Sequence, residues 1–243
     1  MSWLYLSPHL DDAALSCGGL IWEQAHSGEE VSLWTICAGD PPLGPLSPFA
    51  ESVHARWGTG RQASAARRAE DILSCAVLGA AFHHLSIPDC IYRRSPKTGE
   101  ALYGSEEALF SPVHPEETPL VNKLKRQFLR VFKGVANVVC PLALGGHIDH
   151  RLVRAAAEKA GCSLWHYADY PYILKNEIPS SLLQTPGCEE RLFPVSNEGL
   201  SAWAASVAAH ASQISTFWPD LTAMRAAIEK YCLDQGGVRL WRI

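Results

Sequence analysis

The chain has 243 residues, of which 47% are apolar and 19% are charged, and its formal net charge is −4. An apolar content this high with so little charge excludes a mainly disordered chain. The acidic balance disfavours a nucleic-acid-binding protein, which needs a basic excess to neutralise phosphates. The length fits one α/β domain, so we expect residues 1–243 to form a single domain.

The cysteines and the N-terminus predict a cytoplasmic protein. The eight cysteines form no Cys-x-x-Cys pair, and most lie in apolar runs, which favours buried, reduced thiols. The first residues lack the basic start and apolar core of a signal peptide. No apolar run reaches the roughly 18 residues that a membrane helix needs, so we expect no membrane span. The sequence leaves the oligomeric state open.

The first half of the chain alternates between strand-like and helix-like segments. Apolar runs that stop at proline or polar residues predict strands at 3–7, 31–36 and 82–87. A helix is expected at 12–27, closed by Gly28, and another at about 61–78, which ends before Gly79. A polar loop is expected between them, at 39–60. This β-α-β-α-β order predicts a Rossmann-like, mostly parallel sheet with helices on both faces.

The second half begins with an irregular, polar stretch at 89–118. A loop this long in a compact domain is usually functional or mobile. Its basic residues are expected to be solvated, with attraction of an anionic substrate as the alternative; they are Arg93, Arg94 and Lys97. A helix is expected to begin at Thr118, and a buried strand follows at 135–142.

Later elements are shorter and less regular. We expect a helix capped by Asp149 that runs to about residue 160. Short runs at 164–167 and 190–194 predict strands that add to the sheet as antiparallel edges. Two further helices are expected to begin near Asn197 and Pro219, and the first is expected to carry Trp203, Val207, His210 and Ile214.

Reactive side chains follow two of the expected strands. The two motifs are His9-Leu10-Asp11-Asp12 and His147-Ile148-Asp149-His150. Either motif alone is commonly a helix cap or a surface turn. Ligands of open α/β sheets bind at the carboxyl ends of the strands, where both motifs are expected to lie. The two turns are therefore expected to converge in space.

Two histidines and one aspartate form a ligand set that suits a catalytic Zn²⁺ with an open position for water. The same set suits non-haem Fe²⁺, so the residue types leave the metal open. Zinc lowers the pKa of its water to about 7. A second carboxylate can then accept a proton, and a histidine can stabilise the oxyanion or protonate the leaving amine. A non-catalytic nucleotide- or sugar-binding protein is the alternative from another class.

The two motifs resemble those of the LmbE-like/PIG-L family of zinc-dependent N-acetylglucosamine deacetylases. Supporting segments are Gly18-Gly19, Arg67-Arg68-Ala69-Glu70, Pro88-Asp89 and Tyr167-Ala168-Asp169-Tyr170-Pro171. The resemblance covers residues 3 to about 171. It implies that a zinc-bound water removes an N-acetyl group from a small amino-sugar or sugar-conjugate substrate. An amidase with the same machinery and another acyl conjugate as substrate is a further alternative.

The resemblance also implies residue roles. It implies that the zinc ligands are His9, Asp12 and His150. It implies that Asp11 is the general base, and that His147 stabilises the oxyanion or acts as general acid while Asp149 is hydrogen-bonded to it.

Three further residues are candidates for contact with the substrate. The resemblance points to Arg67 and Asp89. Asp40 follows the second strand at the same end of the sheet, where it either borders the pocket or caps a turn. Gly145 stands where some family members carry a tyrosine that assists the oxyanion, so we do not expect that contribution from this position.

Overall fold

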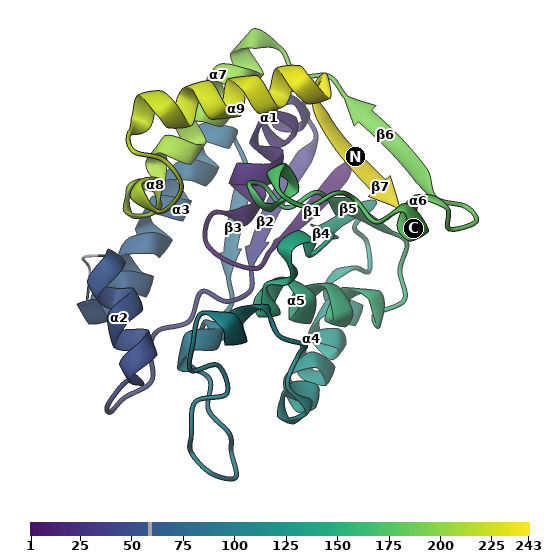
Figure 1. The fold of residues 1–243 in the computed structure, drawn as a ribbon. Coiled ribbons are helices and arrows are strands. Elements are labelled where there is room, and N and C mark those ends of the chain that lie inside the picture. Colours follow the sequence, from purple (N-terminus) through teal and green to yellow (C-terminus); the bar gives the residue numbers. More distant parts are fainter. Residues whose placement is uncertain (58–59) are drawn as a thin grey trace.

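The computed structural model describes residues 1–57 and 60–243, which form a mixed α/β fold around one sheet (Figure 1). Within these residues the sheet has seven strands in the order β3-β2-β1-β4-β5-β7-β6. The strands are β1 (Ser2–Ser7), β2 (Glu30–Thr35), β3 (Ala81–His84), β4 (Asn137–Pro141), β5 (Leu164–Tyr167), β6 (Glu189–Phe193) and β7 (Val238–Arg242). Strands β1 to β5 are parallel, whereas β7 pairs antiparallel with both β5 and β6. The mostly parallel sheet and the antiparallel edge strand expected at 190–194 are confirmed. The expectation for 164–167 was wrong in one respect, because β5 lies inside the sheet and is parallel to β4.

Helices cover both faces of this sheet. The α-helices of the described residues are α1 (Asp12–His26), α2 (Pro48–Trp57), α3 (Ala63–Leu78), α4 (Thr118–Val131), α5 (Ile148–Glu158), α6 (Ser180–Leu183), α7 (Asn197–Ala209), α8 (Ala211–Phe217) and α9 (Leu221–Gln235). Helices α4 and α5 pack on one face, and α1, α3, α7 and α9 pack on the other (Figure 1).

Strand β1 shows how the sequence produces two cores. Successive side chains of a strand point to opposite faces. Trp3 and Tyr5 therefore join the core beneath α1 and α7, while Leu4 and Leu6 join the core beneath α4 and α5. Burial on both faces explains why this segment is a continuous apolar run and not an alternating one.

The topology places a crevice between β1 and β4. From β1 the chain adds β2 and β3 on one side, and it then returns to add β4 and β5 on the other. Tyr5 pairs with Val139 in the parallel register, so the carboxyl ends of β1 and β4 lie side by side. A reversal of strand order of this kind is where open α/β sheets bind their ligands.

Several local expectations differ from the structure. The expected loop at 39–60 contains helix α2. The Ser47 hydroxyl, just before this helix, accepts a hydrogen bond from the Ala50 N–H at 3.1 Å. Residues 58–59 of the expected loop lie outside the described residues. Strand β7 was not expected. The helix expected from Asn197 past residue 210 is divided at His210, whose ψ of 56° is not helical.

Asp149 does not cap α5, because the side chain of His147 accepts the Asp149 N–H and takes that place. No helix in the described part of the chain is both long enough and apolar enough to cross a membrane. The eight cysteines are free thiols, and all except Cys162 and Cys188 are buried.

Candidate active site

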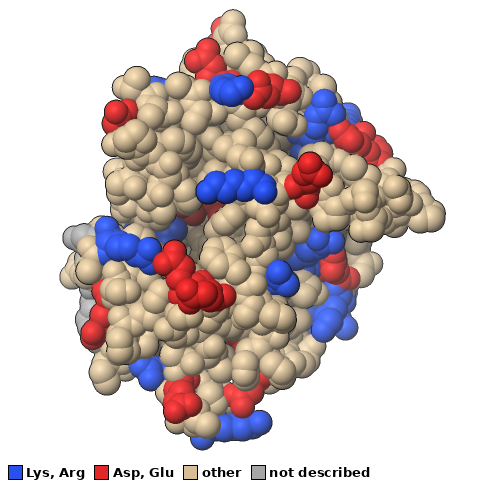
Figure 2. All heavy atoms as spheres, viewed as in Figure 1, with Lys and Arg blue, Asp and Glu red and all other residues tan. Residues whose placement is uncertain are grey.

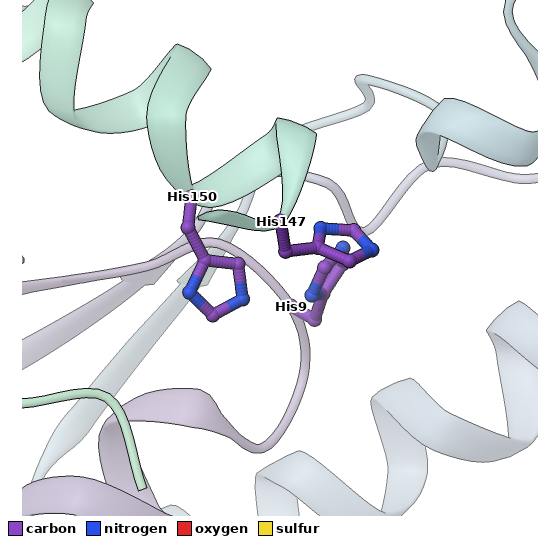
Figure 3. A group of neighbouring side chains, drawn as sticks. All are labelled: His9, His147 and His150. Carbon is purple, nitrogen blue, oxygen red and sulfur yellow. The ribbon is translucent and has the colours of Figure 1, made fainter. Parts of the chain in front are cut away.

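Three imidazoles converge where β1 and β4 end (Figure 3). His9 lies in the turn after β1, while His147 precedes α5 and His150 lies in its first turn. The ring centroid of His9 is 5.0 Å from that of His147 and 5.4 Å from that of His150, and the last two are 5.4 Å apart. One nitrogen from each ring lies within 4.8 Å of the other two. The expected convergence of the two turns is therefore present.

Asp12 lies between two of these rings. Its Oδ2 is 3.2 Å from His9 Nδ1 and 3.3 Å from His150 Nε2. The His9 N–H donates to the same oxygen at 2.8 Å and fixes the carboxylate. A tetrahedral ion with bonds of about 2.1 Å separates its ligand atoms by about 3.4 Å. Both distances from Asp12 are close to this spacing, so its carboxylate is placed to share a divalent metal with either ring.

Each of the two candidate ligand histidines bonds a carboxylate through its other nitrogen. His9 Nε2 lies 3.0 Å from Asp149 Oδ2, and His150 Nδ1 lies 2.6 Å from Asp169 Oδ1. Such partners orient metal-binding imidazoles and raise their basicity. A carboxylate only accepts, so each of these nitrogens carries a proton, while His9 Nδ1 and His150 Nε2 are the nitrogens that face Asp12.

Asp169 was not selected from the sequence as a site residue. The Leu144 N–H donates to its Oδ2 at 2.9 Å, which holds the carboxylate against His150. It follows β5, the strand next to β4, at the carboxyl end of the sheet. Its position after an expected strand was the one feature of the sequence that could have identified Asp169 as a site residue.

The expected hydrogen bond from the Asp149 carboxylate to His147 is not present in the described structure. The carboxylate instead accepts from His9 Nε2, from the Cys90 N–H at 3.1 Å and from Arg93 Nη1. His147 Nδ1 accepts only the backbone N–H of Asp149, at 3.3 Å. The reason is geometric, since residues two apart at the start of a helix do not face each other.

Arg93 also differs from its expectation. It was expected to be solvated, but it is only 7% exposed and lies between Asp149 and Glu117. An arginine buried this deeply must be paired, and no local pattern around Arg93 indicates its partners. Arg94 and Lys97, in contrast, are exposed as expected.

Burial and neighbouring charges separate the pKa values of the three histidines. Burial alone would lower the pKa of His150, but Asp12 and Asp169 outweigh it and raise the pKa to about 10. For His9, burial is likewise outweighed by Asp12 and Asp149, and its pKa is raised. Burial and the two neighbouring histidines lower the pKa of His147 to about 3. His147 is therefore neutral at neutral pH.

The two adjacent carboxylates also differ. Burial raises the pKa of Asp11, although the Arg67 guanidinium, whose Nη2 lies 3.4 Å from Asp11 Oδ1, opposes the shift. For Asp12, His150 and His9 overcome the effect of burial and lower its pKa well below the usual range. Asp12 is thus the permanent anion, and Asp11 is the carboxylate that exchanges a proton more readily.

These groups lie at the base of a cavity of about 530 Å³. Figure 2 shows the hollow in this face of the molecule, with acidic and basic side chains at its edge. Its wall is strongly aromatic, with Trp57, Phe110, Tyr172 and Phe217 among the lining residues. The size and the mixed lining fit a small-molecule ligand rather than a single small ion.

Two of the three expected substrate contacts border this cavity. Arg67 and Asp89 line it, and the Arg67 guanidinium lies 5.2 Å from the centroid of the Trp57 ring. Asp40 is not among the lining residues of the described chain. Its exposed carboxylate is 2.7 Å from Arg68 Nη2.

Tyr172 fills the space beside Gly145. A Cβ at Gly145 would lie 2.5 Å from Tyr172 Cδ1, and Gly145 has a φ of +78° that side chains rarely adopt. The Tyr172 ring borders the cavity and meets the His150 ring edge-on, with centroids 5.8 Å apart. A tyrosine from a different loop thus lies next to the place where the sequence lacks one.

Comparison with known proteins gives a consistent result. The model of the PIG-L family, described as GlcNAc-PI de-N-acetylase, matches residues 4–161. A 2'-N-acetylparomamine deacetylase from Streptomyces fradiae is 31% identical over 175 residues, which are 70% of this chain and 57% of that protein. A protein of the same name from Niallia circulans is 24% identical over 70% of this chain and 67% of that one. The chain thus spans less than two thirds of the first relative.

Among solved structures, the zinc-inhibited form of teicoplanin deacetylase Orf2 superposes with a TM-score of 0.84 at 26% identity. The match covers 100% of this chain and 97% of the other. The deacetylase of the A40926 pseudoaglycone, Dbv21, gives a TM-score of 0.75 at 27% identity over 99% and 95% of the two chains. The likeness to solved deacetylases therefore includes the C-terminal third.

Proposed function

Because this chain belongs to the PIG-L family of de-N-acetylases, we propose that it is a metal-dependent hydrolase that removes an N-acetyl group from an amino-sugar conjugate. The observation that carries the proposal is the position of Asp12 Oδ2, which lies 3.2 Å and 3.3 Å from nitrogens of His9 and His150. This arrangement lies at the base of a cavity of about 530 Å³, beside a second carboxylate and a neutral imidazole.

We propose zinc as the metal, held by His9, Asp12 and His150. Two imidazole nitrogens and one carboxylate oxygen suit zinc in catalytic sites, and ferrous iron is the alternative with the same ligands. When bound, the metal supplies Lewis-acid polarisation of the amide carbonyl and of the attacking water.

Asp11 serves as the general base in this proposal. Its carboxylate lines the cavity beside Asp12, and burial raises its pKa toward the range in which a carboxylate exchanges protons with substrate. It takes a proton from the attacking water as the new C–O bond forms. The same proton then passes to the nitrogen as the C–N bond breaks, so that a free amine and acetate leave.

His147 acts as a neutral hydrogen-bond donor. Its Nδ1 accepts the Asp149 N–H at 3.3 Å, so the neutral ring carries its proton on Nε2. A pKa lowered to about 3 keeps the ring uncharged at neutral pH, which favours oxyanion stabilisation over proton donation to the amine. Of the two roles expected from the resemblance, the first is the one that we propose.

The substrate proposal rests on the cavity and on the relatives together. Arg67 and Asp89 provide polar contacts, and the aromatic wall provides flat surfaces on which sugar rings and apolar substituents can pack. The relatives are named as deacetylases, one of them of an N-acetylated compound. We further propose that the protein works in a reducing compartment such as the cytoplasm, which its free cysteines support.

The test combines metal analysis with an assay for free amine. We expect about one zinc per chain and amine release from N-acetylglucosamine conjugates that a chelator abolishes and added zinc restores. His150→Ala is expected to lose both the metal and amine release. His83→Ala, in exposed β3, is the matched control and should retain both. Amine release that persists in metal-free protein would contradict the proposal.

A further inference from the structure

A chain of buried ionic contacts joins His9 to the segment that follows β3. Asp149 Oδ2 lies 3.0 Å from His9 Nε2, and its Oδ1 accepts from Arg93 Nη1. Arg93 Nη2 in turn donates to Glu117 Oε2 at 3.3 Å, and the Tyr103 hydroxyl donates to the same oxygen at 2.6 Å. The proposed reaction uses none of the last three residues.

The residues in this series of ionic contacts are buried, so each needs the next one to compensate its charge. Asp149 is 0% exposed, Glu117 is 3% exposed and Arg93 is 7% exposed. Water cannot compensate charges at such positions, so each carboxylate relies on the guanidinium between them. Removal of Arg93 would leave two buried carboxyl groups without their shared partner.

The geometry of Asp149 decides which nitrogen of His9 faces the candidate metal site. His9 Nε2 meets Asp149 Oδ2 at 3.0 Å, so the opposite nitrogen, Nδ1, faces Asp12 and the candidate metal site. The carboxylate itself has two further donors, the Cys90 N–H and Arg93 Nη1, both from the segment 90–93. That segment thus fixes the plane in which Asp149 meets His9.

We propose that Arg93, supported by Glu117, is a positioning residue for the metal site. It holds Asp149, and through Asp149 it sets the ring orientation and the tautomer of His9. The inference rests on the proposed function for the identity of the site, but it concerns metal binding and not turnover. Segment 90–117 belongs in this view to the metal site, although it contributes no ligand.

The test uses two matched substitutions at neighbouring arginines. Arg93→Lys keeps a positive charge but loses the fork that reaches both carboxylates. Arg94→Lys makes the same change at an exposed side chain that bonds the carbonyls of Pro45 and Gly99. Zn²⁺ and Co²⁺ are the probes. Their Kd values are measured by chelator competition, the Co²⁺ absorption spectrum reports ligand geometry, and thermal unfolding of the metal-free protein reports folding.

We expect Arg93→Lys to weaken Zn²⁺ binding about 10- to 100-fold and to shift the Co²⁺ spectrum, as loss of an outer partner of a ligand does elsewhere. Arg94→Lys should match the wild type in both. Glu117→Gln, which keeps the shape beside Arg93, should weaken binding in the same direction by less, and it carries the test if Arg93→Lys does not fold.

Wild-type Kd and an unchanged Co²⁺ spectrum in the folded variants would overturn the inference. Failure of the proposed function has a different signature. It would appear as wild-type protein that binds the metal but releases no amine, and it would leave these metal readouts intact.

Discussion

His210 provides a test of the electrostatics at a buried residue that is not a proposed metal ligand. It lies between α7 and α8, it is 2% exposed, and neither ring nitrogen has a hydrogen-bond partner among the described residues. Burial lowers its pKa to about 4, and the nearby carboxylates of Asp71 and Glu70 oppose this only in part. The unfolded chain should titrate near the ordinary value of about 6.5.

The sign of the effect follows from these two values. A pKa depressed in the folded state means that the unfolded chain binds more protons between about pH 4 and pH 6.5. The contribution of His210 to stability is therefore complete above pH 6.5 and is lost as the pH falls toward 4. Between pH 7.5 and pH 5.0 the loss amounts to about 2 kcal/mol, and the limit at lower pH is about 3.4 kcal/mol.

The assay is urea unfolding of the wild type and of His210→Leu at pH 7.5 and pH 5.0. Leucine has a similar size and no titrating group, so the variant should lose about 2 kcal/mol less than the wild type between the two pH values. Comparison of the two losses of unfolding free energy removes the contribution of the other histidines. One of these is His166, whose pKa is also lowered by burial, to about 4. Equal losses in the two proteins would refute the reasoning.

Three further predictions follow from the site and the packing. Asp11→Asn should retain the metal, because Asp11 is not a proposed ligand, but lose roughly 10²- to 10⁴-fold in amine release; full turnover would exclude it as the base. His147→Gln should lower kcat about 10²- to 10³-fold at wild-type metal content, measured by steady-state kinetics; unchanged kcat would exclude oxyanion stabilisation. Gly18→Ala should destabilise the fold by about 1–3 kcal/mol in urea unfolding, because its Cβ would lie 2.4 Å from Trp203 Cδ1, whereas Gly104→Ala meets no atom within 4 Å and should be neutral.

The candidate metal ligands could be predicted because their signal is local. His9 and Asp12 are three residues apart in one turn, and His150 lies in a second motif that also follows a strand. The rule that ligands bind where strands end then brings both turns to one edge. Helix α4 could be predicted for the same reason, because its buried residues recur at helical spacing, at Val121, Leu124 and Phe128.

Residues whose role depends on distant partners could not be predicted. Arg93 pairs with Asp149, which is 56 residues away, and Asp169 reaches His150 from the end of β5. A charged residue in a polar loop looks the same in sequence whether it is buried or solvated. Strand β7 was missed because five residues after a glycine pair have too little pattern, and its pairing with β5 and β6 exists only in the folded sheet.

The crevice between β1 and β4 has a consequence for the stage of folding at which the candidate metal site forms. His9 and Asp149 are 140 residues apart in the chain, yet they touch. Contacts of such long range form late, since the intervening chain must first be ordered. A nascent chain that has emerged only through β3 already carries His9, Asp11 and Asp12 but still lacks His150, the third proposed ligand. With the proposed ligands, metal binding requires β4 and α5 to be in place, and a bound ion would link the turn after β1 to the first turn of α5.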